Sequence, residues 1–236
     1  MRFFIVILII LLTIPMAYSW NSKTHEYIVE RVYNSLEIRN YLNLELIKFG
    51  STSPDLVFHD TRLHHYPPSY DKAIYWLNLT KFYLSNNEFD NASYSFGVAS
   101  HYISDSYSIP HHIQKEDPKL HTKFENQVKF SSINKKCSNN IFNLNQSLYN
   151  EYKLNKEQEW QEWIDTQDSS IPTEKVEKSI NIIYSVAIET FDTKCVNPTL
   201  IEKSDFTISN KSIIYSVIII LVFLVIFIKL NKGPKK

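Results

Sequence analysis

Apolar side chains recur at helical spacing along the middle of this chain. One such series runs through Ile28, Val29, Val32 and Leu36, and a second, near the other end, comprises Val176, Ile180, Ile183, Ala187 and Phe191. Because positions three and four apart lie on one face of an α-helix, both series predict amphipathic helices that bury one side. No segment alternates apolar and polar residues as a half-buried strand does. The pattern therefore predicts an all-α domain.

Proline and glycine positions divide the rest of this domain. A helix is expected from about Asp90 to Tyr107, ending before Pro110, and another begins near Leu120. The segments Ser51 to Tyr70 and Asp165 to Pro172 are rich in Pro, Ser and Asp, and we expect loops there.

The first residues have the pattern of a secretory signal. The apolar run Phe3 to Ile14 follows a basic residue, and Ala17 and Ser19 occupy the small-residue positions before a cleavage site. A signal peptide over residues 1–19 would leave Trp20 as the new amino terminus. An uncleaved anchor is the alternative, but the apolar run is short for a membrane span.

A second apolar segment, Ile213 to Ile228, precedes four lysines, which is the pattern of a membrane span with positive charge on the cytoplasmic side. We expect a single-pass type I protein of the cell membrane with its domain outside the cell. The expected parts are a signal peptide (1–19), a helical domain (20–203), a short stalk (204–211), a transmembrane helix (212–230) and a basic cytoplasmic tail (231–236).

Composition removes several classes of function. Lys plus Arg and Asp plus Glu each total 25, so no net field attracts nucleic acid. With 3 Gly in 236 residues, the chain has no phosphate-binding or dinucleotide-binding glycine loop. Four glycosylation sequons, at Asn78, Asn91, Asn145 and Asn210, are compatible with export.

Two cysteines, Cys137 and Cys195, are present. In an oxidising compartment they could join the middle of the domain to its last helix, and free thiols are the alternative.

Histidine is distributed unevenly. All 8 histidines lie between His25 and His121. His101 and Asp105 are four residues apart on one expected helix, and His121 and Glu125 are four apart on another, so each pair projects from one helical face. A single pair of this kind is most often an ordinary contact on a solvated helix face. Two such pairs indicate two pairs of metal ligands.

Further candidate ligands lie nearby in the sequence. His111 and His112 follow the proline that ends the first helix, His64 and His65 lie in a proline-bounded loop, and Asp55 lies in the run SPDLVFHD. Imidazole and carboxylate groups together suit zinc, and a site that leaves a coordination position for water is catalytic.

These residues carry a specific resemblance. Phe96 to Asp105 (FGVASHYISD), the following Pro110 and His111, and His121 to Asn126 (HTKFEN) resemble the central signature of zinc-dependent phospholipase C. Trp20 to His25, the run Gly50 to Asp55 and the residues from His64 to Pro68 match family elements in the same order. The resemblance implies an exported, compact multi-helix domain of the phospholipase C/P1 nuclease type with three zinc ions.

The resemblance also implies the ligands of each ion. The first zinc would be held by Asp55, His64, His101 and Asp105, the second by His111, His121 and Glu125, and the third by Trp20, His25 and a bridging Asp105. Asp55 is also the candidate general base. His65 and His112 are the alternatives to His64 and His111, and His59 matches no family element.

The expected function is hydrolysis of phosphodiesters, with a phospholipid substrate at the outer membrane surface and nucleic acid as a less favoured one. The interval from Trp20 to His25 is nearer that of the related S1/P1-type zinc nucleases, so a nuclease or another phosphodiesterase is the alternative. A different class is a non-catalytic surface protein whose metals only stabilise the fold. The sequence gives no oligomeric state.

Overall fold

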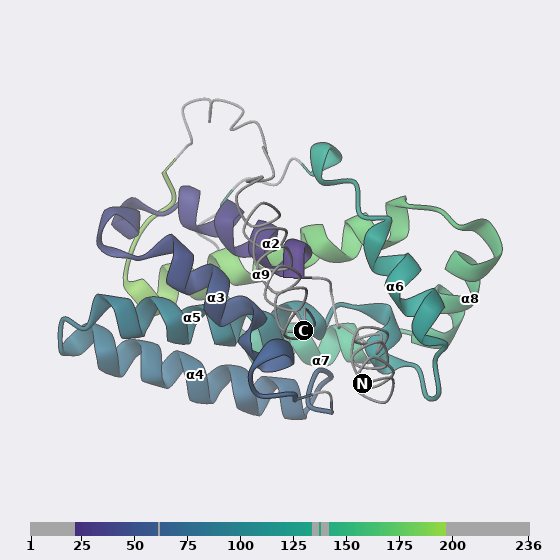
Figure 1. The fold of residues 1–236 in the computed structure, drawn as a ribbon, viewed down its shortest axis with the longest axis horizontal. Coiled ribbons are helices and arrows are strands. Elements are labelled where there is room, and N and C mark those ends of the chain that lie inside the picture. The colour runs from purple at the N-terminus through teal and green to yellow at the C-terminus, as the bar shows by residue number, and fades with distance from the viewer. Residues whose placement is uncertain (1–21, 61, 134–136, 138–141, 197–236) are drawn as a thin grey trace, which may run out of the picture. The chain divides into compact units, whose positions relative to one another are not determined.

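The computed structural model describes residues 22–60, 62–133, 137 and 142–196, and within them the chain is helical (Figure 1). The one β contact in this part of the chain is an isolated antiparallel bridge between Leu36 and Cys195. The elements are α2 (Ser22–Asn34), η1 (Glu37–Tyr41), α3 (Leu44–Leu56), α4 (Pro68–Ser85), α5 (Phe89–Asp105), η2 (Ile109–His112), α6 (Pro118–Asn126), η3 (Phe130–Ser132), α7 (Leu144–Tyr152), α8 (Lys156–Thr166) and α9 (Ser170–Phe191). The predicted all-α class is confirmed for these residues.

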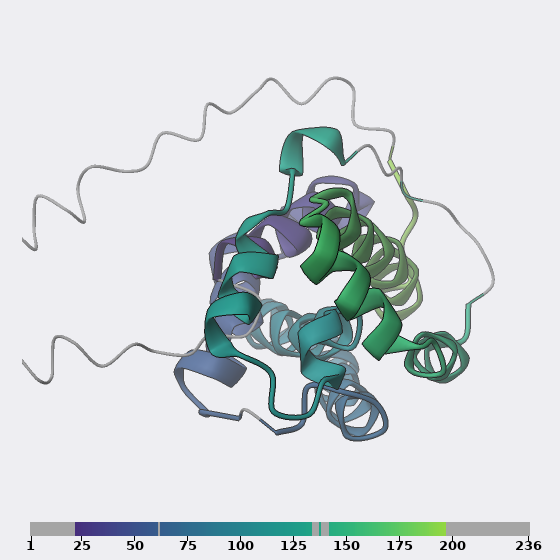
Figure 2. The same cartoon turned by 90° about the vertical axis from the view of Figure 1, so that its right-hand side faces the viewer.

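Helix α5 is the centre of the fold. It lies beside α4, to which the short turn 86–88 connects it, and it also packs against α3 and α9 (Figures 1 and 2). Every residue from Ser95 to Asp105 is buried. A helix covered on all sides can hold polar side chains only if other groups satisfy them. His101 and Asp105, near the end of α5, therefore need partners from other elements.

Glycines bring α3 and α5 unusually close together. A Cβ atom at Gly97 would lie 2.1 Å from the carbonyl oxygen of Ile47, and one at Gly50 would lie 2.2 Å from that of Tyr94. No side chain fits at either position without moving a backbone. The two glycines therefore set the spacing of the helices that carry Asp55 and His101.

The two helical series of the sequence are confirmed. Ile28, Val29 and Val32 are buried on α2, and the five apolar positions from Val176 to Phe191 are buried on α9, against which α2 packs. The hydroxyl groups of Tyr184 and Ser35 lie 3.1 Å apart between these elements. Leu36 is buried as well, although it lies beyond the end of α2.

The prediction of a loop from Ser51 to Tyr70 was wrong at both ends. Residues as far as Leu56 continue α3, with Pro54 inside it, and α4 begins at Pro68. Hydroxyl groups that indicate a turn in the sequence instead donate to carbonyls of the same helix: Ser51 to Lys48 at 2.7 Å and Ser53 to Phe49 at 2.8 Å. These bonds let small polar side chains be buried against α5.

The second predicted loop, Asp165 to Pro172, was also too long. Asp165 still belongs to α8, and α9 begins at Ser170. Pro172 lies in the first turn of α9, where a missing N–H leaves no helical hydrogen bond unmade.

Cys137 and Cys195 form a disulfide, which confirms the first of the two alternatives for these cysteines. Cys195 lies just beyond α9, so the bond attaches the segment before α7 to the end of the helical unit. The sequon residues Asn78, Asn91 and Asn145 are exposed, and their glycosylation stays a prediction.

The expected signal peptide, stalk, transmembrane helix and tail lie outside the described residues. None of the helices within those residues has the length and apolar character that crossing a bilayer requires.

Candidate metal centre

His101 and Asp105 lie one turn apart on buried α5 and face each other. The Nε2 atom of His101 is 3.1 Å from Oδ2 of Asp105. On the other side of the ring, Nδ1 is 2.8 Å from the carbonyl oxygen of Ser51 on α3. Because a carbonyl only accepts, Nδ1 carries a proton and donates it to Ser51, and Nε2 is the ring nitrogen that faces the carboxylate.

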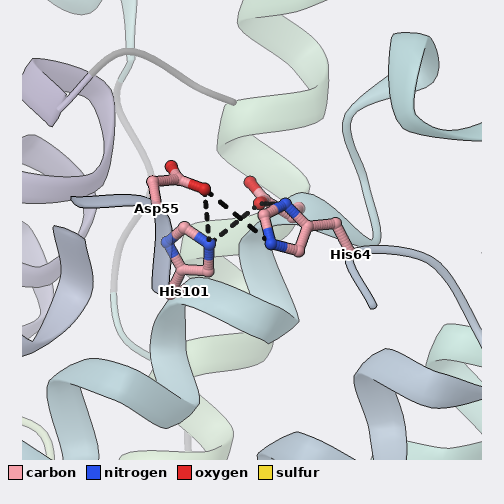
Figure 3. Close-up of side chains that lie close together, drawn as sticks. Asp55, His64 and His101 are labelled. Atoms are coloured by element: carbon pink, nitrogen blue, oxygen red, sulfur yellow. Dashed lines mark ion pairs between the residues drawn. The ribbon is translucent and has the colours of Figure 1, made fainter. Parts of the chain in front are cut away.

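Asp55 and His64 complete a group of four around this pair. Asp55 comes from the last turn of α3 and His64 from the loop before α4, and Figure 3 shows both side chains pointing toward His101. Oδ1 of Asp55 lies 3.6 Å from Nε2 of His101 and 3.8 Å from Nε2 of His64. Nδ1 of His64 lies 2.8 Å from Oδ2 of Asp105. The four residues offer one ligand atom each within 4.8 Å of one another.

His25, on α2, reaches the same carboxylate from the opposite side. Its Nε2 atom is 3.4 Å from Oδ1 of Asp105, whereas His64 and His101 approach Oδ2. Nδ1 of His25 lies 3.1 Å from the hydroxyl of Ser104. The Asp105 carboxylate is thus shared between two sets of histidines, as a bridging ligand would be. Trp20, expected beside His25, lies outside the described residues.

A second group consists of His111 from η2 with His121 and Glu125 from α6. Nε2 of His121 is 2.8 Å from Oε1 of Glu125, one turn further along α6. The rings of His111 and His121 are 4.9 Å apart, and Nε2 of His111 is 3.7 Å from Oδ2 of Asp105. The two groups therefore adjoin at Asp105.

The alternative histidines have other surroundings. His65 is half-buried and its ring lies 6.2 Å from that of His112, outside both groups. Nε2 of His112 donates to the carbonyl of Ser106 at 2.9 Å. His59 is exposed, with a left-handed φ of 51°, in the loop after α3. The geometry thus favours His64 and His111 as the members of the two groups.

The donor atoms suit a cation better than they suit one another. His25, His64, His101 and Asp105 are at most 2% exposed. Yet Nε2 of His25, both ring nitrogens of His64 and Nε2 of His101 make no hydrogen bond of acceptable geometry. Leaving such groups unsatisfied in a protein interior costs about 1–3 kcal/mol each. Nitrogen and carboxylate oxygen donors that converge in this way fit zinc, which takes four such ligands at about 2 Å.

Burial and neighbouring charges shift the pKa values of His101 and Asp105 in opposite directions. Burial, assisted by His101, lowers the pKa of His25 to about 3, so its imidazole is neutral at pH 7. Burial also lowers the pKa of His101, but the Asp105 carboxylate outweighs it and raises that pKa to about 9. Burial raises the pKa of Asp105, whereas the surrounding imidazoles hold it well below 3.8. Asp105 is therefore a buried anion that requires compensating positive charge.

Three groups outside the ligand prediction hold the histidines in place. Ser51 accepts from His101 and Ser104 contacts His25, as described above, while Oε1 of Glu116 lies 2.5 Å from Nδ1 of His121. A carboxylate or carbonyl on the far nitrogen of a ligating histidine fixes its ring and raises its basicity. Nothing in the sequence indicated the contact of Ser104 with His25, although Ser104 directly precedes Asp105. Glu116 and the Ser51 carbonyl had no sequence signal either.

Comparison with known proteins agrees with this chemistry. Residues 24–180, well over half of the chain, match the model of a family described as zinc-dependent phospholipase C. No curated protein and no solved structure matches the chain. The matched range includes each of the histidines and carboxylates of the two groups. The chain belongs to the zinc-dependent phospholipase C family, which is a family of hydrolases.

Proposed function

We propose that this protein hydrolyses the bond between glycerol and phosphate in membrane phospholipids, with zinc ions bound at the two groups and a third beside His25. The convergence of three buried histidines on Asp105, with ring nitrogens that lack hydrogen bonds, carries the proposal. Zinc, when bound, lowers the pKa of water toward about 7 and offsets the negative charge of phosphate oxygens.

The chain's own residues would divide the work as follows. Asp105 would bridge two ions, because its two oxygens face different histidines. Asp55 is the carboxylate of the first group that retains some exposure, at 10%, so it is placed to contact an incoming substrate and to accept the proton of the attacking water. Water then adds to phosphorus, the bond from phosphorus to the glycerol oxygen breaks, and that oxygen takes up a proton. The products are a diacylglycerol and a phosphorylated head group.

Trp20 would complete the third ion's ligands through its amino group and carbonyl, as the family resemblance implies. His25 supports this assignment because its Nε2 atom lies by Asp105 without a hydrogen bond. A protein with one additional residue before Trp20 is expected to bind two zinc ions in place of three. Unchanged zinc content would refute the role of the terminal amine.

We further propose that the protein is a type I membrane protein whose catalytic domain faces the outside of the cell. The apolar segment 213–228 with its following lysines supports the anchor. The Cys137–Cys195 disulfide supports an oxidising compartment. Cleavage of the helical unit by protease added to intact cells is the expected result, and full protection would contradict it.

The decisive experiment combines metal content with substrate choice. The purified protein is expected to contain three zinc ions and to release phosphocholine from phosphatidylcholine, with no cleavage of single-stranded DNA or RNA. His101→Ala should lose zinc and activity together, because that ring contacts both Asp55 and Asp105. His59→Asn is the matched control: Asn tolerates the left-handed backbone there, and both properties should be retained. A zinc-free, inactive wild type after reconstitution would reject the proposal.

A further inference from the structure

Large apolar side chains are exposed on the side of the domain formed by α3, α4 and the loop that follows α3. Phe49 on α3 is 52% exposed, Tyr75 on α4 is 58% exposed, and Phe58 in the loop is 40% exposed. Leu56 and Val57, next to Phe58, are 39% and 50% exposed. Single exposed apolar residues are common, whereas a contiguous group marks a surface that binds something.

The exposed rings of Phe49, Phe58 and Tyr75 are connected through the half-buried rings of Trp76 and Tyr94. The rings of Phe49 and Tyr94 are 5.7 Å apart, Tyr94 and Trp76 6.1 Å, and Trp76 and Phe58 5.8 Å in a nearly parallel stack. Tyr75 lies 5.6 Å from Trp76. We call these five residues the aromatic surface. It extends over α3, α5, α4 and the following loop, so three helices hold it as one rigid face.

This surface adjoins the metal centre. Leu56, Val57 and Phe58 directly follow Asp55, the proposed ligand that retains exposure. A pocket of about 370 Å³ opens between the loop and α4, and Tyr102 forms part of its wall. The ring of Tyr102 lies 5.5 Å from that of His101, edge-on, so one side chain separates the pocket from the zinc ligands.

The charges around that pocket are predominantly positive. Arg62 and Lys72 line it together with a single carboxylate, that of Asp60. Lys72 lies 3.9 Å from Asp60, which also accepts from the Tyr102 hydroxyl at 2.9 Å. One cation therefore remains in excess beside the aromatic rings. Aromatic and cationic side chains both favour the interfacial layer of a bilayer, where acyl chains meet phosphates.

We propose that the aromatic surface docks this domain onto a phospholipid bilayer, so that Asp55 and the metal centre face the lipid head groups. The proposal rests on the proposed function for the choice of partner. Phe, Tyr and Trp are the side chains that partition into the interfacial layer, and Arg62 and Lys72 would lie at the depth of the phosphates. The surface would thus set the orientation of the domain and not only its distance from the membrane.

Insertion can be measured without catalysis. A fluorophore is attached at Tyr75→Cys in the full-length protein, which is then incorporated into phosphatidylcholine vesicles whose acyl chains carry a shallow nitroxide quencher. The matched control is Leu154→Cys, because Leu154 is 43% exposed but lies in the turn after α7 and lines a different pocket. Strong quenching at position 75 with little at position 154 is expected. Equal quenching at both positions would overturn the proposal.

Activity provides a second readout. Phe49→Ser combined with Tyr75→Ser is expected to lower hydrolysis of vesicle phosphatidylcholine about tenfold, because apolar area no longer enters the bilayer. Hydrolysis of a short-chain phosphatidylcholine below its micelle concentration should be unchanged. Equal loss on both substrates would mean that these residues contact the reacting lipid or maintain the fold, and it would overturn the docking role. Leu154→Ser should affect neither substrate.

The two proposals fail separately. A wild-type protein that hydrolyses no phospholipid but shows quenching at position 75 would refute the phospholipase activity and retain the docking surface. Concentration-dependent dimerisation that Phe49→Ser abolishes, without quenching at position 75, would assign the surface to a second copy of the chain and refute docking on lipid.

Discussion

Both halves of the described chain bury charged side chains, but they compensate the charge differently. In the carboxyl-terminal half, Lys175 on α9 donates to Glu151 on α7 at 2.9 Å and to Glu159 on α8 at 2.8 Å. Lys156 donates to the same two carboxylates. Two cations therefore balance two anions, and hydrogen bonds link α7, α8 and α9.

In the amino-terminal half the compensation is left incomplete. Three histidines approach Asp105 at hydrogen-bonding or slightly longer distances, yet several of their inward nitrogens have no hydrogen bond. Buried polar groups without hydrogen-bond partners lower the stability of the fold. A bound cation would supply the missing partners. The carboxyl-terminal cluster of Glu151, Lys156, Glu159 and Lys175 is thus complete without a ligand. The histidine cluster of His25, His64, His101 and Asp105 is arranged for an added cation.

The largest effect is expected at the shared carboxylate of the histidine cluster. Asp105→Asn should remove zinc from both groups and abolish hydrolysis, because Asp105 is the residue at which the groups adjoin. In the metal-free state the same change should lower the free energy of unfolding, because the surrounding imidazoles stabilise the ionised Asp105 and its loss leaves the buried His101 without that partner. Elemental analysis and urea unfolding in a chelator measure the two effects. Wild-type zinc content in the variant would contradict the role of Asp105 as a ligand shared by the two groups.

Substitution in the carboxyl-terminal cluster is expected to lower stability without an effect on zinc binding. Lys175→Met should lower the free energy of unfolding by about 3 kcal/mol, because it leaves buried carboxylates with one cation fewer. Zinc content should stay at the wild-type value. Lys178→Met, on the exposed side of the same helix in a pair with Glu174, is the control and should change stability by less than about 1 kcal/mol. Zinc loss in Lys175→Met alone would show that the two clusters are coupled.

Acid should destabilise the carboxyl-terminal cluster through Glu151. Burial raises the pKa of Glu151, but Lys156 and Lys175 outweigh it and hold that pKa below 4.5. A lowered pKa means that Glu151 stabilises the fold fully above pH 4.5 and that this contribution is lost as the pH falls through its folded-state pKa. Unfolding of the metal-free protein should therefore be more acid-sensitive than that of Glu151→Gln. Glu157→Gln, an exposed change on α8, should retain wild-type sensitivity.

The smallest effect is expected at the histidine that neighbours the second group. His112→Ala removes one hydrogen bond to the Ser106 carbonyl and should cost about 1 kcal/mol of stability. Its zinc content should be unchanged, whereas His111→Ala should lose zinc from the second group. Reversed results for the two variants would exchange their roles.

Much of the helical fold could be predicted from residue periodicity. The apolar series on α2 and α9 and the long helix that ends before Pro110 were correct because burial of one helical face leaves a direct sequence signal. The end of α3 was missed for a tertiary reason. Ser51 and Ser53 look like turn residues until their hydroxyls are bonded to the helix's own carbonyls and covered by α5.

The candidate site was predictable where its members share a helix. The pairs on α5 and α6 follow from a spacing of four, whereas the choice of His64 over His65 depended on a family resemblance. Glu116 could not be found, because only the turn into α6 brings its carboxylate to His121. The aromatic surface could not be found either, since its rings come from segments that the sequence separates.

The close contact of α3 and α5 at Gly50 and Gly97 has a consequence for engineering. Backbone atoms in direct contact, and not interlocking side chains, fix how far the Asp55 end of one helix lies from His101 on the other. A contact of that kind cannot be loosened by repacking. Residues around the mouth of the site can therefore be exchanged in combinatorial libraries to alter substrate preference, while Gly50 and Gly97 are held constant to preserve the geometry of the donor atoms.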